Sequence, residues 1–175
     1  CKAQYAKAID SAVFPGQQGG PLMHIIAAKA VAFGEALRPD FKVYQQHILD
    51  NAQVLAAGLR SEGFDLVAGG TDTHLMLVDL TRTGVTGKDM QLRLDDVNIT
   101  CNKNGVPFDT KGPTVTSGIR LGTPAVTTRG FTRDDMRDIA RLIKTTLTDF
   151  EGSQAHIREE VAAICQRHPL YPDLV

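Results

Sequence analysis

One arginine lies in the middle of a short apolar segment, and this segment constrains the fold more than any other. The alternation in residues 117–123 (Ser-Gly-Ile-Arg-Leu-Gly-Thr) predicts a strand with Ile119 and Leu121 on one face and Arg120 on the other. No acidic residue lies within seven positions of Arg120. A charge on a largely buried strand needs a partner. Three remain open: a distant acid, water reached by snorkelling, or a ligand carboxylate that fits the guanidinium fork.

Composition limits the classes of partner. The 175 residues are 42% hydrophobic and 22% charged, which suits one domain with a core of its own. Nineteen basic and twenty acidic side chains give a net charge of −1, with no basic cluster, so we expect no nucleic-acid partner. The longest apolar stretch, Ile25–Phe33, is interrupted by Lys29 and is too short to span a bilayer, so we expect no membrane partner.

Cysteine and histidine usage bears on redox compartment and metal binding. The three cysteines (Cys1, Cys101 and Cys165) form no CxxC pair, which favours reduced thiols and a cytoplasmic location. The five histidines are scattered without the spacing of zinc ligands, so we expect no metal site. The chain begins at Cys1 in helix-like sequence, and we interpret it as a fragment of a longer polypeptide.

Periodicity and turn residues predict an α/β two-layer (α+β) fold, with a small, mainly antiparallel sheet and helices on one face. The first of the expected helices is apolar over more than half its circumference and should be buried or packed on two sides. The long irregular segment 102–115 is of a kind that is usually functional. We expect helices over 22–37, 40–62, 86–96, 132–150 and 153–168, and strands over 64–68, 74–80, 99–101 and 119–122.

A glycine-rich loop precedes the first of these helices. Residues 15–21 read Pro-Gly-Gln-Gln-Gly-Gly-Pro, and backbone N–H groups at such a junction can bind a phosphate. No Gly-Lys-Ser/Thr follows, so this is not a Walker A motif. A tight turn that starts a helix explains the same residues without any ligand.

Four runs, in this order, strongly resemble the C-terminal part of the serine hydroxymethyltransferase family, whose members are pyridoxal-phosphate enzymes of one-carbon metabolism. The resemblance extends from about Ser11 to Tyr171. It implies the small C-terminal domain of the aspartate-aminotransferase type of fold, with residues 39–175 in that domain and residues 1–38 linking it to an absent cofactor-binding domain. The runs are SAVFPGQQGGPLMH (11–24), GGTDTHLMLVDL (69–80), NITCNKN (98–104) and TSGIRLGTPA (116–125), the last continuing to 129–131 (Arg-Gly-Phe).

The resemblance implies roles for two residues discussed above. Arg120 matches the arginine that binds the α-carboxylate of the amino-acid substrate. Gly20 matches a glycine that reaches the cofactor phosphate of the neighbouring subunit, which implies a homodimer or a dimer of dimers. The expected substrates and partners are serine or glycine and tetrahydrofolate, with pyridoxal phosphate as cofactor.

The segment after Cys101 resembles the folate-contacting part of the family. Asn104 matches an asparagine that hydrogen-bonds the pterin ring, although an asparagine in a turn before Gly105 is also a common pattern. Three residues, Gly112, Pro113 and Thr114, match a folate-contacting stretch that more commonly reads Ser-Pro-Phe. The aromatic contact of that stretch is therefore in doubt here.

The catalytic groups of the family do not fall in this sequence. The Schiff-base lysine of the family lies in a Thr-His-Lys-Thr run, and none of the eight lysines here has that context. We therefore expect no catalytic residue in this chain and no activity from it alone, whereas the parent would be a glycine hydroxymethyltransferase. Two alternatives stay open: a non-catalytic carboxylate-binding or dimerisation module, and another pyridoxal-phosphate enzyme of the same fold, such as an aldolase or aminotransferase.

Overall fold

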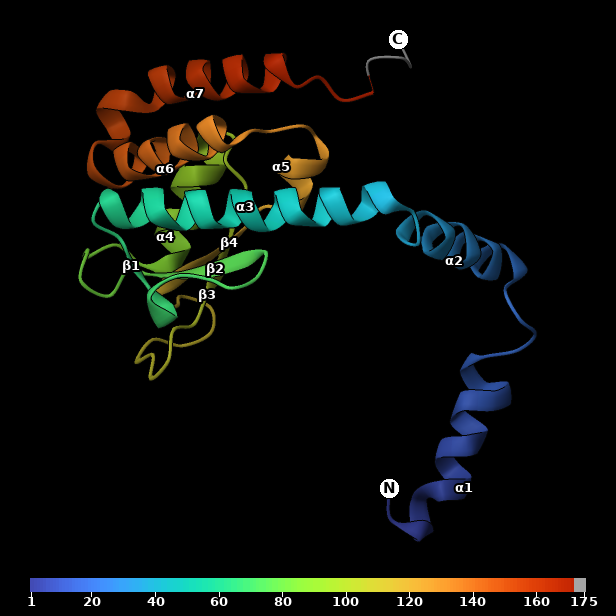
Figure 1. Cartoon of the computed structure of the whole chain (residues 1–175). Coiled ribbons are helices and arrows are strands. Elements are labelled where there is room, and N and C mark those ends of the chain that lie inside the picture. The colour runs from blue at the N-terminus through green and yellow to red at the C-terminus, as the bar shows by residue number, and fades with distance from the viewer. Residues whose placement is uncertain (172–175) are drawn as a thin grey trace. The chain divides into compact units, whose positions relative to one another are not determined.

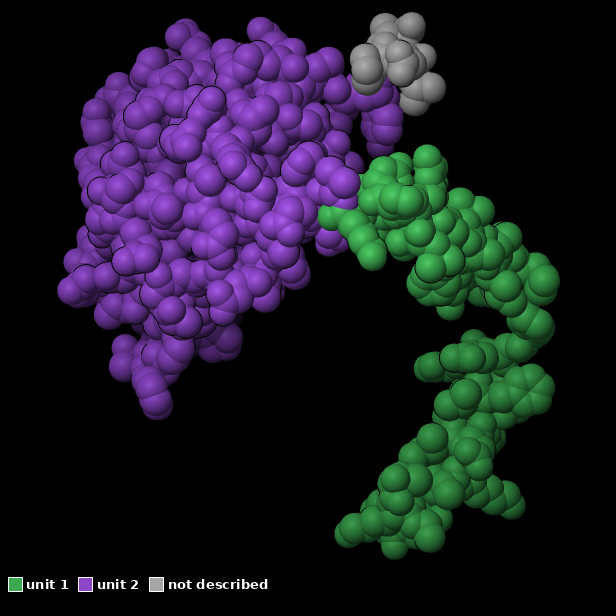
Figure 2. Space-filling model, viewed as in Figure 1, with its two compact units in different colours: residues 1–42 green, residues 43–175 purple. Residues whose placement is uncertain are grey.

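The computed structural model describes residues 1–171, and the chain divides into two compact units, Cys1–Lys42 and Val43–Val175 (Figure 2). The first unit holds α1 (Ala3–Ser11), the irregular turn η1 (Ala12–Gln17) and α2 (Met23–Ala36). The helix expected over 22–37 is thus confirmed. Its expected burial is wrong for the described residues, because Val31 and Phe33 remain 62% and 67% exposed. Nothing in residues 1–171 covers that apolar surface.

The second unit combines helices with a small sheet (Figure 1). It contains most of α3 (Pro39–Ser61), then β1 (Asp65–Leu66), the 3₁₀ turn η2 (Val67–Gly69), β2 (Leu75–Asp79), α4 (Gly87–Asp96), β3 (Asn102–Asn104), β4 (Gly118–Gly122), α5 (Pro124–Thr128), α6 (Arg133–Thr148) and α7 (Phe150–Arg167).

The four strands form one antiparallel sheet in the order β1-β2-β4-β3. Strand β4 therefore has a hydrogen-bonded neighbour on each side. Its register places Leu121 opposite Met76 and Ile119 opposite Val78, and all four side chains are buried. Because side chains alternate between the two faces of a strand, these residues share one face of the sheet.

Helices cover that face and complete the hydrophobic core (Figure 1). Apolar positions at three- and four-residue steps point from the helices toward the strands. The largest fully buried side chains include Leu59 of α3, Met90 and Leu94 of α4, Met136, Leu142 and Ile143 of α6, and Ile157 of α7. The prediction of a helix-rich α+β chain with a small antiparallel sheet is confirmed.

The strand expected over 99–101 is wrong. The Ile99 N–H donates to the carbonyl of Leu94 at the end of α4, 2.8 Å away, so the apolar residues there close the helix instead of pairing. The paired strand is β3, whose residues Asn102–Asn104 are polar because it forms the edge of the sheet. The expected strand 64–68 is shortened to β1, and helix α5 was not expected.

Glycine at position 87 allows α4 to start against β4. A Cβ atom there would lie 2.3 Å from the carbonyl oxygen of Gly118 and 2.2 Å from Thr116 Oγ1. The side chain of Thr86 caps the helix by accepting a hydrogen bond from the Asp89 N–H. The amides of Gly87 and Lys88 donate to Thr116 and Val115, so the first turn of α4 holds the segment that leads into β4.

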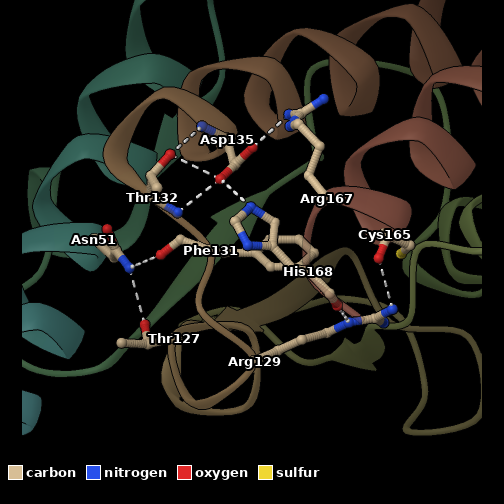
Figure 3. Close-up of polar contacts among 9 residues, drawn as sticks. All are labelled: Asn51, Thr127, Arg129, Phe131, Thr132, Asp135, Cys165, Arg167 and His168. Atoms are coloured by element: carbon tan, nitrogen blue, oxygen red, sulfur yellow. Dashed lines mark hydrogen bonds and ion pairs between the residues drawn. The ribbon is translucent and has the colours of Figure 1, made fainter. Parts of the chain in front are cut away.

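The expected capping box at the start of α6 is present and belongs to a larger polar cluster (Figure 3). Asp135 accepts hydrogen bonds from the backbone and hydroxyl of Thr132, from Arg167 and from His168, at 2.6–3.0 Å. Burial acts to raise the pKa of Asp135, but these hydrogen bonds prevail and lower it to about 2. Arg129 donates to the carbonyls of His168 and Cys165. These hydrogen bonds hold the end of α7 against the segment before α6.

A matched pair of truncations in α4 tests the core. Leu94 is fully buried, whereas Leu92 is 52% exposed on the same helix. Leu94→Ala should lower the free energy of unfolding by about 2–5 kcal/mol because it leaves a cavity. Leu92→Ala should change it by less than about 0.5 kcal/mol, as expected of a surface position. Urea unfolding followed by circular dichroism measures both, and equal losses would contradict this assignment of the core.

Candidate functional site

The face of the sheet opposite the helices carries the candidate site. Because Ile119 and Leu121 point into the core, Arg120 points the other way and is exposed. Asn102 of β3 lies directly opposite Arg120 in the register, and Asn104 lies two residues further along the same strand. The three polar side chains therefore share what we call the free face, with Asn104 about 7 Å along the strand from Asn102.

Within residues 1–171, Arg120 makes one hydrogen bond. Its Nε donates to Asn102 Oδ1 over 3.2 Å. Among residues 1–171 no carboxylate lies within ion-pair distance of it. The guanidinium is not buried, because only one face of β4 is covered. Of the three partners left open by the sequence, a distant acid is excluded for the described residues, and solvent or a ligand remains.

Asn104 ends β3 opposite Gly118 and is half-buried. Its Nδ2 donates to the carbonyl of Gly105, 2.8 Å away, in the manner of a turn asparagine. This bond leaves Oδ1 with no donor from the part of the chain that the structure describes. The amide is thus held in one orientation and presents an acceptor. The turn asparagine that the sequence allowed is observed, and the contact of Asn104 with a pterin ring stays a prediction.

A carboxylate organises the loop between β3 and β4. Asp109 Oδ2 accepts from the N–H groups of Val106 and Ser117 at 3.2 and 2.8 Å, and Oδ1 accepts from the Lys111 N–H and the Ser117 hydroxyl at 2.9 and 2.7 Å. These bonds, led by that from Lys111, lower the pKa of Asp109 to about 2. Asp109 therefore closes the loop next to the first residue of β4.

Gly112, Pro113 and Thr114 lie on the exposed part of this loop. The N–H groups of Val115 and Thr116 both donate to the carbonyl of Gly112 at 3.0 Å, so the stretch forms a tight turn. No hydrogen bond joins it to Arg120 or Asn104 among the described residues. The loop brings the stretch into the same unit as these two residues, and its exposed surface is available to a ligand.

Gly20 belongs to the first unit, between η1 and α2. The residue is exposed, and no atom lies within 4 Å of the position that a Cβ would take. Within residues 1–171, the amides of Gly19 and Gly20 donate no hydrogen bond to the protein. These amides are therefore accessible, and phosphate binding by the glycine-rich loop stays a prediction.

Phe108 was not singled out from the sequence. Its side chain is fully exposed, and its backbone φ is 60°, a left-handed conformation that is uncommon for a bulky residue. Thr116, at the other end of the loop, has the same φ and is buried. The sequence signal that could have identified Phe108 is an aromatic residue directly before Asp109, whose carboxylate orders the loop. Such strain often accompanies a functional loop.

No group of three or more histidine, cysteine or acidic side chains in residues 1–171 is arranged to hold a metal ion. None of the helices described here combines the length and the apolar character needed to cross a bilayer.

The loop should respond to acid through Asp109. Its folded pKa of about 2 lies below the usual unfolded value of about 3.9, so its stabilisation is complete above about pH 4 and is lost as the pH falls through 2. Asp109→Asn should therefore be destabilising at pH 5, with the difference from wild type shrinking toward pH 2. Urea unfolding across this range measures the difference, with Asp72→Asn as the control. A difference independent of pH would contradict the assignment.

Replacing Phe108 should relieve strain. Phe108→Asn puts a residue that tolerates the left-handed region at this position and removes no buried surface. We expect the free energy of unfolding to rise by about 0.5–1 kcal/mol, measured by urea denaturation. A fall of similar size would show instead that the aromatic ring makes stabilising contacts.

The chain also matches a known protein family. Residues 1–143 match the sequence model of the family described as Serine hydroxymethyltransferase. The match includes the glycine-rich loop, β3, the loop that follows it and β4 with Arg120. It covers more than half of the chain, and the chain therefore belongs to the serine hydroxymethyltransferase family.

Proposed function

We propose that this chain forms the substrate-carboxylate and folate-binding part of a glycine hydroxymethyltransferase. The reaction interconverts L-serine plus tetrahydrofolate with glycine plus methylene-tetrahydrofolate. The main observation in support of this proposal is that the Arg120 guanidinium is exposed on the free face and has no acidic partner among the described residues. We also propose the small-domain architecture of the aspartate-aminotransferase type, which the antiparallel sheet with helices on one face supports.

Arg120 would bind the α-carboxylate of serine or glycine. Its Nε is engaged by Asn102, which leaves the two terminal nitrogens for a pair of parallel hydrogen bonds to a carboxylate. Fixing the carboxylate fixes the rotation of the amino acid about its Cα. That rotation decides which bond at Cα is aligned with a cofactor ring and is therefore broken.

Pyridoxal phosphate, the cofactor of the family, supplies an electron sink when bound. The open amides of Gly19 and Gly20 fit a phosphate group, and Gly20 is the residue that we assign to it. We propose that residues 1–38 connect the small domain, residues 39–175, to a cofactor-binding domain that contributes the Schiff-base lysine. On this proposal no catalytic residue comes from the described chain.

The folate co-substrate would lie along the β3–β4 loop. Asn104 presents its Oδ1 as an acceptor for ring N–H groups, and the turn at Gly112, Pro113 and Thr114 offers an exposed surface in the loop that follows. An aldolase or aminotransferase of the same fold would use Arg120 but would have no need of Asn104. Binding of tetrahydrofolate by the holoenzyme therefore separates the proposed activity from these alternatives.

The proposal extends to assembly and location. The uncovered apolar side chains of α2 support a homodimer or a dimer of dimers, in which Gly20 would serve the neighbouring subunit. The three free thiols support a reducing compartment, and we place the enzyme in the cytoplasm.

Arg120→Lys in the holoenzyme tests the central assignment. The substitution keeps the positive charge but removes the planar fork, so one of two charged hydrogen bonds is lost. We expect serine affinity to fall by about 10- to 100-fold, corresponding to about 1.5–3 kcal/mol. Titration of the cofactor absorbance with serine measures it.

The matched control is Arg137→Lys, since Arg137 is an exposed arginine that pairs with Asp134 on α6, one of the helices that pack on the core face of the sheet. Serine affinity in this control should equal that of the wild type. Unchanged affinity in Arg120→Lys would reject the proposed function.

A further inference from the structure

We propose that Asn102 is a positioning residue for Arg120, and that its neutrality is what keeps the arginine available to an anionic substrate. This inference rests on the proposed function, because it concerns the same carboxylate site. No motif drew attention to Asn102 in the sequence, and its relation to Arg120 comes from the pairing of β3 with β4.

The geometry fixes the orientation of both side chains. Asn102 and Arg120 are direct cross-strand partners, and Arg120 Nε lies 3.2 Å from Asn102 Oδ1. The other end of the amide, Nδ2, donates to the carbonyl of Lys103 at 2.9 Å. An arginine can only donate, so the oxygen of Asn102 must face it and the amide cannot be reversed. The oxygen and the nitrogen of the Asn102 amide are thus both hydrogen-bonded.

The strand that carries Asn102 is held in place from the opposite side. Strand β3 has three residues and lies at the edge of the sheet. The backbone N–H of Lys103 donates to Gln91 Oε1 of α4 over 2.7 Å. This bond attaches the edge strand to a helix of the core. The acceptor that faces Arg120 is therefore part of a fixed scaffold and not of a mobile loop.

A neutral acceptor orients Arg120 without cancelling its positive charge, which an acid could not do. One hydrogen bond to Nε orients the guanidinium plane and leaves the fork of terminal nitrogens open. An aspartate in the same place would hold the plane equally well, but it would neutralise the charge that attracts the substrate carboxylate. A substrate would then have to compete with an ion pair within the protein.

The test compares two substitutions in the holoenzyme. Asn102→Asp keeps the shape and the acceptor oxygen but adds a negative charge, and it should raise the KM for serine at least tenfold with a smaller change in kcat. Asn102→Ala removes the orienting bond without adding charge, and it should raise KM only several-fold. Lost ground-state binding appears in KM. The control is Asn98→Asp, which adds the same charge at an exposed position before β3.

Comparing KM with stability separates positioning from mere structural support. If Asn102 only supported the fold, both variants would lose stability, the aspartate variant also because an oxygen would replace the Nδ2 donor to the Lys103 carbonyl, and the KM of the folded enzyme would stay unchanged in both. Urea unfolding of each variant accompanies the kinetics. If Asn102→Asp does not fold, a several-fold rise in KM for folded Asn102→Ala still supports the proposal, and an unchanged KM overturns it.

The outcomes also separate this inference from the proposed function. If Arg120→Lys weakens serine binding while Asn102→Asp behaves as the wild type, the positioning role is overturned and the carboxylate site stands. The positioning role is likewise overturned if Asn102→Ala raises KM more than Asn102→Asp does. If Arg120→Lys leaves serine binding unchanged, the proposed function itself is overturned.

Discussion

The pairing of β4 on both of its edges is the constraint on which the rest of the structure depends. Strand β2 on one side and β3 on the other fix the backbone of β4, and period-two alternation then sends Ile119 and Leu121 into the core. A shift of one residue in register would bury Arg120 and expose both apolar side chains. Burying those side chains, worth about 1.5–3 kcal/mol each, therefore also keeps the arginine on the free face.

Polar groups, and not apolar burial, order the connection from β3 to β4. The carboxylate of Asp109 accepts four hydrogen bonds, two of them from Ser117 at the start of β4. The first turn of α4 donates to Val115 and Thr116 in the same segment. The hydrophobic core and the β3–β4 loop are thus stabilised by different forces. The loop can be rigid enough to present Asn104 while remaining exposed to a ligand.

Sequence reasoning succeeded where the signal is local. The alternation around Arg120 predicted β4, and the spacing of Thr132 and Asp135 predicted the start of α6. It failed at β3, because an edge strand of polar residues has no apolar alternation to mark it. Asn102 and Asp109 were missed because their partners lie 18 and 8 residues away, and the pairing exists only once the strands align. The roles expected for Gly20 and for the folate-contacting residues were assigned from the family resemblance, because local sequence patterns could not assign them.

The arginines of the second unit show how a functional guanidinium can be distinguished from a structural one. Arg141 forms two hydrogen bonds with Glu160, and Arg129 holds two carbonyls at the end of α7. Both terminal nitrogens of Arg141, and Nε with one terminal nitrogen of Arg129, are engaged within the protein. Among the residues that the structure describes, Arg120 is engaged only through Nε, by a neutral oxygen, so its charge and its fork remain available. A partner that orients without neutralising is a stronger sign of an anion site than exposure, because an arginine that merely snorkels to water needs no such partner.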